Sequence, residues 1–231
     1  MMSIRSLAGA CLSACVALGA FAVPASAQNY PTRTITMIVP FAAGGPTDVI
    51  SRIVTAHMAQ TLGQSIVIEN VVGAGGTTAT TRAARAANDG YTLVTGHMGT
   101  HAASVPLYPK LAYHPEKDFE PVALLAGTPI LIVARKDFPP KDLKEFIAYV
   151  KANAEKVNAA HAGIGSVSHA SCELLNSILD VKPVGVPFNG TGPAMNALVA
   201  GQVDYMCDQI VNAVPQINAG TIKAYAVATP E

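Results

Sequence analysis

Charge is scarce in this chain of 231 residues: only 13% of the residues are charged, whereas 50% are hydrophobic. Such a composition excludes a disordered segment or a solvated coil, because both need much charge and few apolar residues. Lys plus Arg and Asp plus Glu number 15 each, so nothing favours binding to nucleic acid or to a membrane surface. The length suffices for one large domain or two small ones with real cores.

Long apolar runs are missing beyond the first 27 residues. Residues 1–27 combine a basic start at Arg5, an apolar run over 7–23 and the small-residue site Ala25-Ser26-Ala27. This pattern predicts a signal peptide cleaved after Ala27; a membrane anchor is the alternative, but the run is short and contains glycines. No later segment approaches about 18 uninterrupted apolar residues. We therefore expect a soluble, exported mature protein with 14 basic and 15 acidic residues, a net charge of −1.

Cysteine is equally scarce. Cys11 and Cys15 belong to the expected signal peptide, which leaves Cys172 and Cys207 in the mature protein. An even pair in an exported chain favours a disulfide between them. The alternative is two separate buried thiols.

Strand and helix patterns alternate along the rest of the chain. The β-branched apolar run 34–41 predicts a buried strand, and the 3.6-residue apolar period over 46–62, with Pro46 and Asp48 in its first turn, predicts a helix. Similar patterns predict strands at 65–69, 91–95, 129–134, 156–161, 183–187, 203–207 and 223–228, and helices at 77–87, 143–154, 167–179 and 193–199. This alternation is typical of an α/β protein in which helices flank a mostly parallel sheet. The proline-bearing stretch 113–121 interrupts it, so we expect two α/β units joined near residue 125.

Four strand-to-helix loops share glycine and hydroxyl groups: 41–48 (FAAGGPTD), 73–78 (GAGGTT), 163–169 (GIGSVSH) and 188–193 (FNGTGP). Free N–H groups and the positive end of the helix dipole bind anions at helix N-termini. In an open α/β sheet such loops gather at the carboxyl ends of the strands. The alternative is that glycine serves turning and Ser or Thr serves capping, whatever the ligand. Four such loops in two units favour an anion-binding cleft.

Nucleotide and metal motifs are incomplete. The 73–78 loop begins like G-x-G-x-x-G but carries Thr78 at the last glycine, and no glycine loop is followed by G-K-S/T. We therefore expect no NAD or ATP. His97 and His101 could bind a metal from one helix, but the intervening Met98-Gly99-Thr100 resembles a loop, and no cysteine or carboxylate pattern completes a zinc site. We interpret both histidines as ordinary polar loop residues.

Hydrolase motifs are incomplete too. Residues 163–167 (GIGSV) do not form the G-x-S-x-G elbow. Ser168 and His169 are neighbours in sequence, which does not bring a nucleophile into contact with a base. A secreted serine hydrolase or esterase stays the alternative to a binding protein, as does a sensory or structural module.

Five stretches, taken in order, carry a family resemblance: TITMIVPFAAGGPTDVISRIV, GQSIVIENVVGAGGTTATTRAARAANDGYTL, HAGIGSVSHASCELL, VPFNGTGPAMNALVAGQVDYMCDQI and INAGTIKAYAVATPE. They resemble the substrate-binding proteins of tripartite tricarboxylate transporters, also called Bug receptors. The resemblance covers essentially the whole mature chain, and its specificity lies in the order and spacing of the motifs.

The resemblance implies a two-lobed periplasmic receptor of the Venus-flytrap kind, with lobes at 28–125 and 126–231. It would be a monomer without catalytic activity, cofactor or metal, and would pass a small carboxylate to a two-subunit membrane permease. Family members hold the carboxylate largely through backbone amides and ordered waters. The positions that match by motif are Phe41, Ala42, Ala43, Gly44, Gly45, Thr47, Asp48, Gly75 and Thr77 in the first lobe, and Gly165, Ser166, Ser168, His169, Gly190, Thr191 and Asp208 in the second.

The C-terminal end departs from the family pattern. The last expected strand, 223–228, ends three residues before Glu231, whereas family members continue, finish the second lobe and return to complete the first. We therefore expect a chain truncated at its C-terminus, with both lobes incomplete and apolar surface exposed; a short natural ending is the alternative.

Overall fold

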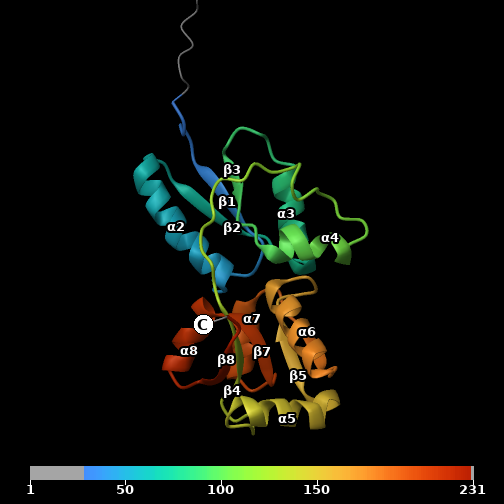
Figure 1. Cartoon of the computed structure of the whole chain (residues 1–231). Coiled ribbons are helices and arrows are strands. Elements are labelled where there is room, and N and C mark those ends of the chain that lie inside the picture. The colour runs from blue at the N-terminus through green and yellow to red at the C-terminus, as the bar shows by residue number, and fades with distance from the viewer. Residues whose placement is uncertain (1–28, 230–231) are drawn as a thin grey trace, which may run out of the picture. The chain divides into compact units, whose positions relative to one another are not determined.

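The computed structural model describes residues 29–229 (Figure 1). The expected signal peptide and its cleavage site lie outside the described residues. Arg33–Glu231 forms one compact unit, to which all helices and strands below belong. Within residues 29–229, no helix is long and apolar enough to cross a membrane.

The first sheet consists of three parallel strands in the order β2-β1-β3: β1 (Ile35–Val39), β2 (Ile66–Asn70) and β3 (Thr92–Val94). Helix α2 (Pro46–Leu62) follows β1, and α3 (Thr77–Ala84) follows β2 after the 3-10 turn η1 (Ala74–Gly76). The central strand β1 is almost wholly buried, which explains its continuous apolar sequence, because a central parallel strand is covered on both faces.

Helix α2 has the predicted bounds for local reasons. Pro46 occupies its first turn, where the fixed φ of proline suits a helix start, and Gly63 ends it with a left-handed φ of 66°. Asp48 in the first turn accepts hydrogen bonds from the Gly44 N–H (3.0 Å), from the Arg52 guanidinium and from the Asn70 amide (2.9 Å). Burial alone would raise the pKa of Asp48, but these partners hold it below its usual value. The loop before α2 is therefore braced by a buried carboxylate.

The second sheet has five strands in the order β6-β5-β7-β4-β8. They are β4 (Ile130–Arg135), β5 (Asn158–His161), β6 (Val184–Pro187), β7 (Tyr205–Gln209) and β8 (Ile222–Val227). Strand β5 pairs in parallel with β6 and β7, but β4 is antiparallel to both β7 and β8. The second sheet is therefore mostly parallel, as expected, but β4 runs opposite to the other strands. Since β4 enters from an irregular connection and not from a crossover helix, its strand pattern carried no information on direction.

Two hydrophobic clusters cover the faces of this sheet. Helices α7 (Thr191–Val199) and α8 (Ile210–Asn218) contribute Met195, Leu198 and Ala213 to the cluster around Leu131 and Val133 of β4. Helices α5 (Leu143–Asn153) and α6 (Val167–Leu179) contribute to the opposite cluster, which contains Ile132 and Ala134 of β4, Phe146, Val150, Cys172, Tyr205 and Cys207. The alternating side chains of β4 therefore enter both clusters. Cys172 and Cys207 are joined as a disulfide between α6 and β7, with a Cα–Cα distance of 5.4 Å.

Two helical segments differ from the sequence-based expectation. Residues 210–218, for which the sequence patterns predict no element, form α8 in spite of Pro215. The segment around Met98-Gly99-Thr100, predicted to be a loop, leads into a π-helical turn, η2 (Gly99–Ala103), and α4 (Ser104–Leu107). That prediction was wrong because distant groups stabilise the turn: the buried Tyr113 hydroxyl donates to the Thr100 carbonyl and, at 3.2 Å, to the Ser104 hydroxyl.

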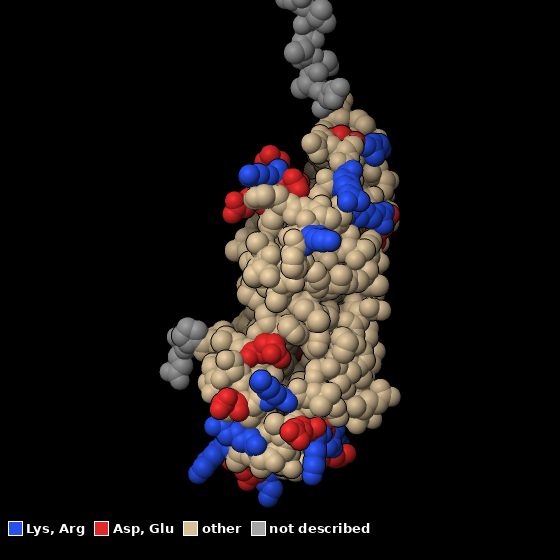
Figure 2. All heavy atoms as spheres, turned by 90° about the vertical axis from the view of Figure 1, so that its right-hand side faces the viewer, with Lys and Arg blue, Asp and Glu red and all other residues tan. Residues whose placement is uncertain are grey.

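Charged residues lie toward the two ends of the face in Figure 2, and the surface between them is largely without Lys, Arg, Asp or Glu. Acidic and basic side chains occur together at both ends. This face shows no extended basic surface of the kind that nucleic acid requires.

Candidate functional site

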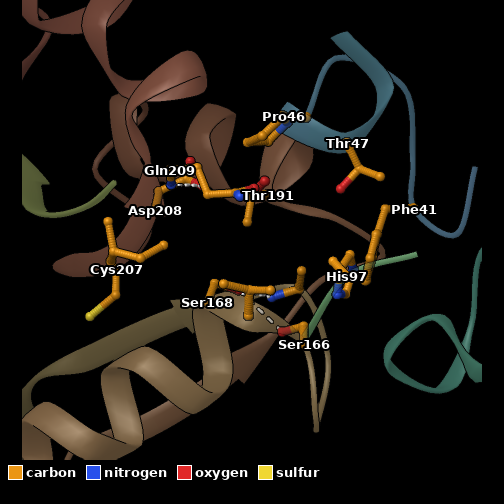
Figure 3. A pocket seen from close by; sticks show the side chains of 14 residues that line it. Phe41, Pro46, Thr47, His97, Ser166, Ser168, Thr191, Cys207, Asp208 and Gln209 are labelled. Atoms are coloured by element: carbon orange, nitrogen blue, oxygen red, sulfur yellow. Dashed lines mark hydrogen bonds between the residues drawn. The ribbon is translucent and has the colours of Figure 1, made fainter. Parts of the chain in front are cut away.

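A small cavity lies where the loops of the two sheets meet (Figure 3). The first sheet contributes Phe41, Gly45, Pro46 and Thr47 from the β1–α2 connection and His97 from the segment after β3. The second sheet contributes Ile130, Ala162, Ser166, Val167, Ser168, Thr191, Cys207, Asp208 and Gln209. Figure 3 shows Phe41 and His97 together on one side, with Cys207 and Asp208 on the other.

Four helices begin at this cavity. Pro46 and Thr47 open α2, Ser166 caps α6, Thr191 opens α7, and Gln209 is the N-cap of α8. The first amides of a helix have no acceptor within the helix, and the aligned peptide dipoles leave roughly half a positive charge at each N-terminus. No Lys or Arg is among the lining residues. Attraction for an anion therefore comes from backbone amides and dipoles.

The two serines at the start of α6 have structural roles: Ser166 caps the helix, and Ser168 holds the loop before it. Ser166 Oγ accepts from the His169 N–H at 3.2 Å, and Ser168 Oγ accepts from the Ala162 N–H at 2.9 Å. The two hydroxyls are 3.2 Å apart. In the described part of the chain no histidine ring nitrogen bonds to either hydroxyl, and His169 Nδ1 instead accepts from the Gly165 N–H at 3.4 Å. The nucleophile–base contact that a serine hydrolase needs is not formed by these residues.

Asp208 is the one carboxylic acid among the lining residues, and it is only 1% exposed. Its Oδ1 accepts from the Gln209 N–H at 2.8 Å, and its Oδ2 accepts from the Asn212 amide. Burial raises the pKa of Asp208 to about 7, although these bonds and one from Thr191 act to lower it. The pKa of this carboxyl therefore lies well above its ordinary value, near neutral pH.

His97 also lines the cavity, and sequence reasoning missed it. Its Nδ1 accepts from the Gly99 N–H at 2.9 Å, so the proton of the neutral ring is on Nε2. The ring stacks on Phe41 with 5.1 Å between centroids. Burial, and next the neighbouring His101, lowers the pKa of His97 to about 4, so the ring is neutral at neutral pH. Its position directly after the carboxyl end of β3 was the signal that could have identified it.

The motif-matched positions divide into two groups. Seven of them line the cavity: Phe41, Gly45, Thr47, Ser166, Ser168, Thr191 and Asp208. Nine do not: Ala42, Ala43, Gly44, Asp48, Gly75, Thr77, Gly165, His169 and Gly190. Gln209 and Ile130 join the lining without having been expected there.

Several glycines outside the cavity lining allow close contact between the backbones of two loops. The Ala42 N–H donates to the Asn189 carbonyl at 2.9 Å, and a Cβ on Gly190 would lie 3.0 Å from Ala42 N. A Cβ on Gly75 would lie 2.0 Å from the Ile164 carbonyl oxygen, which also accepts from the Tyr108 hydroxyl at 2.8 Å. These loops therefore lie against each other at positions where no side chain fits.

Comparison with known proteins identifies the family. Residues 50–231 match the model of the tripartite tricarboxylate transporter family receptor. The chain belongs to this family. The resemblance inferred from the motifs is confirmed, and so is the fold class: an α/β fold with two helix-flanked sheets, as in periplasmic binding proteins of this receptor family.

The curated relatives are longer than this chain. A UPF0065 protein from the TAR-I ttuE-ttuC' intergenic region of Agrobacterium vitis is 44% identical over 202 residues, which are 87% of this chain and 58% of the relative. BugT of Bordetella pertussis is 32% identical over 217 residues, which are 94% of this chain and 67% of BugT. The chain thus spans less than two thirds of the Agrobacterium relative.

Solved relatives share the fold closely. MatC of Rhodopseudomonas palustris, solved with bound malate, is 64% identical and superposes with a TM-score of 0.85 over 87% of this chain and 69% of MatC. The periplasmic binding protein BugD is 47% identical with a TM-score of 0.85, over 87% of this chain and 67% of BugD. A third relative, from R. palustris and solved with adipate, is 33% identical with a TM-score of 0.84, over 87% of this chain and 68% of its own.

Proposed function

We propose that this chain is a periplasmic solute receptor that binds a small dicarboxylate in the cavity between its two sheets and delivers it to a two-subunit membrane permease. The observation that carries the proposal is a cavity at which four helices begin and which no Lys or Arg lines. Amides and helix dipoles can hold a carboxylate without a countercharge.

Four-carbon dicarboxylates are the ligand class that we favour. MatC, at 64% identity, was solved with malate, whereas the relative with adipate is only 33% identical.

Binding would couple the two lobes, at about 28–125 and 126–231. The ligand would contact Pro46–Thr47 on one side and Ser166–Ser168 and Thr191 on the other, so it favours the state in which both sides are close. The closed form would then be presented to the permease. We propose no catalytic step, because the hydroxyls of both cavity serines already accept hydrogen bonds from backbone amides.

A thermal-shift panel tests this proposal. The compounds are malate, succinate, adipate, citrate, acetate and glutamate, with dimethyl malate as a matched uncharged control. At 100 times its Kd a ligand adds about 2.7 kcal/mol to the free energy of unfolding, which raises Tm by roughly 5–10 °C for a chain of this size. We expect malate or succinate to do so and dimethyl malate to have no effect.

The same samples show whether the protein converts its ligand chemically. Malate followed by proton NMR should stay unchanged in the presence of the protein. Turnover of malate or of an ester, or a panel in which no carboxylate shifts Tm, would contradict the proposed function.

A further inference from the structure

The charge balance of the cavity is unusual for an anion site. Its lining holds one carboxyl, on Asp208, and no Lys or Arg. Asp208 is 1% exposed, and its recorded hydrogen-bond partners are neutral: the Gln209 N–H and the side chains of Asn212 and Thr191. A dicarboxylate that enters this cavity therefore meets a buried acid and no compensating cation.

Titratable groups on the surrounding elements do not compensate Asp208. Helices α7 and α8, which start beside it, contain no titratable side chain. The groups on the other packed elements are His169 and Glu173 on α6, His161 on β5, the Asp48–Arg52 ion pair on α2, the Arg135–Asp204 ion pair at the far ends of β4 and β7, and His97 across the cavity. No charge–charge effect from any of them contributes to the pKa of Asp208.

The N-termini of α7 and α8 cannot fully stabilise both the Asp208 carboxylate and a ligand carboxylate. Without a bound ligand, the dipoles of α7 and α8 favour the ionised form of Asp208. A bound carboxylate competes for the same dipoles and adds a like charge in a space from which water is largely removed. Two carboxylates that share a site do not both stay ionised, and the pKa of one of them rises strongly.

We propose that Asp208 takes up one proton from solvent when a dicarboxylate binds and then donates a hydrogen bond to it, which makes Asp208 the residue that selects the ligand's acceptor oxygen. This rests on the proposed function. The step converts a carboxylate and one solvent proton into a carboxylic acid, and no other bond forms or breaks. The cost of protonation at neutral pH is small, because burial already raises the pKa of Asp208 to about 7.

The affinity for a dicarboxylate should fall as the pH rises. The pKa of Asp208 is higher in the complex than in the free protein, so the gain in affinity is full below the free value of about 7 and is lost as the pH rises through the value in the complex. His97, whose pKa is about 4, stays neutral over this range. Aliphatic carboxyls of the ligand also titrate lower, at about pH 4–5.

Isothermal titration calorimetry with malate tests the inference. The binding enthalpy is measured at about pH 7.5 in phosphate, imidazole and Tris, which differ in ionisation enthalpy, and the slope against that enthalpy gives the protons taken up. We expect a positive slope of less than one proton, because a carboxyl with a pKa of about 7 is partly ionised at this pH and becomes protonated in the complex. From about pH 6.5 to 8.5, Kd should rise at least about fivefold.

Two variants test whether the proton is taken up by Asp208. Asp208→Asn keeps the shape without the titration, so malate binding should release or take up no proton and Kd should stay flat over this pH range. Asp180→Asn makes the same chemical change at an exposed position beyond the end of α6, and the proton slope should equal that of the wild type.

The outcomes separate the two hypotheses. Saturable malate binding with zero proton slope in the wild type, or a wild-type slope in Asp208→Asn, overturns the inference and leaves the receptor function standing. Absence of malate binding at every pH overturns both. If Asp208→Asn does not fold, the wild-type slope alone decides.

Discussion

Substitution Gly192→Ala should weaken ligand binding although it replaces a glycine by a better helix former. Gly192 lies in the first turn of α7, and its backbone needs no left-handed φ. An added Cβ would lie 2.9 Å from the Ala43 carbonyl oxygen and 3.1 Å from both Gly44 C and Gly45 N. All three atoms are backbone, so no side chain can rotate away, and the two loops must separate by several tenths of an ångström.

The magnitude follows from the cost of overpacking. Forcing an extra methyl into a filled contact costs typically about 1–3 kcal/mol. If the ligand needs both loops at their present separation, this cost appears in binding and raises the Kd of malate roughly 5- to 150-fold, since about 1.4 kcal/mol corresponds to tenfold. Within α7 itself the alanine is favourable by up to about 1 kcal/mol, so the fold of the second sheet should persist.

Calorimetric titration with malate measures the change in Kd, and far-UV circular dichroism shows whether the fold persists. Gly127→Ala is the matched control, because a Cβ at Gly127 meets nothing within 4 Å, and it should leave Kd unchanged. A wild-type Kd in a folded Gly192→Ala protein would refute the reasoning that the contact of these loops sets the cavity.

Two further predictions concern stability. Reduction of the Cys172–Cys207 disulfide, which closes a sequence separation of 35, should lower the free energy of unfolding by roughly 4 kcal/mol in urea titrations; two reactive thiols in the denatured, unreduced protein without residues 1–27 would contradict the bond. Asp142→Ala removes the N-cap acceptor of the Glu145 N–H (2.8 Å) and should cost about 1 kcal/mol in the same assay. Asp142→Asn, which keeps a capping oxygen, should cost clearly less, and equal losses would contradict the capping role.

Local signals account for the elements that sequence reasoning located well. Helices α2 and α6 have the predicted bounds, because Pro46 and the Ser166 cap define their starts and the apolar period runs through each. The direction of β4 and the π-helical turn after His97 were not predictable in this way. The first depends on where the chain enters the second sheet, and the second on hydrogen bonds from Tyr113, which lies outside the turn.

Local sequence suffices to predict that glycine–hydroxyl loops precede the helices, and that Thr47, Ser166 and Thr191 lie at helix N-termini. Those features depend on neighbouring residues alone. Which of these residues share a cavity could not be predicted in this way, because it depends on how the loops of two separate sheets pack. Packing sets Gly75 and Gly190 against opposing backbone, brings His97 into the lining, and buries Asp208 in a cavity without a cation.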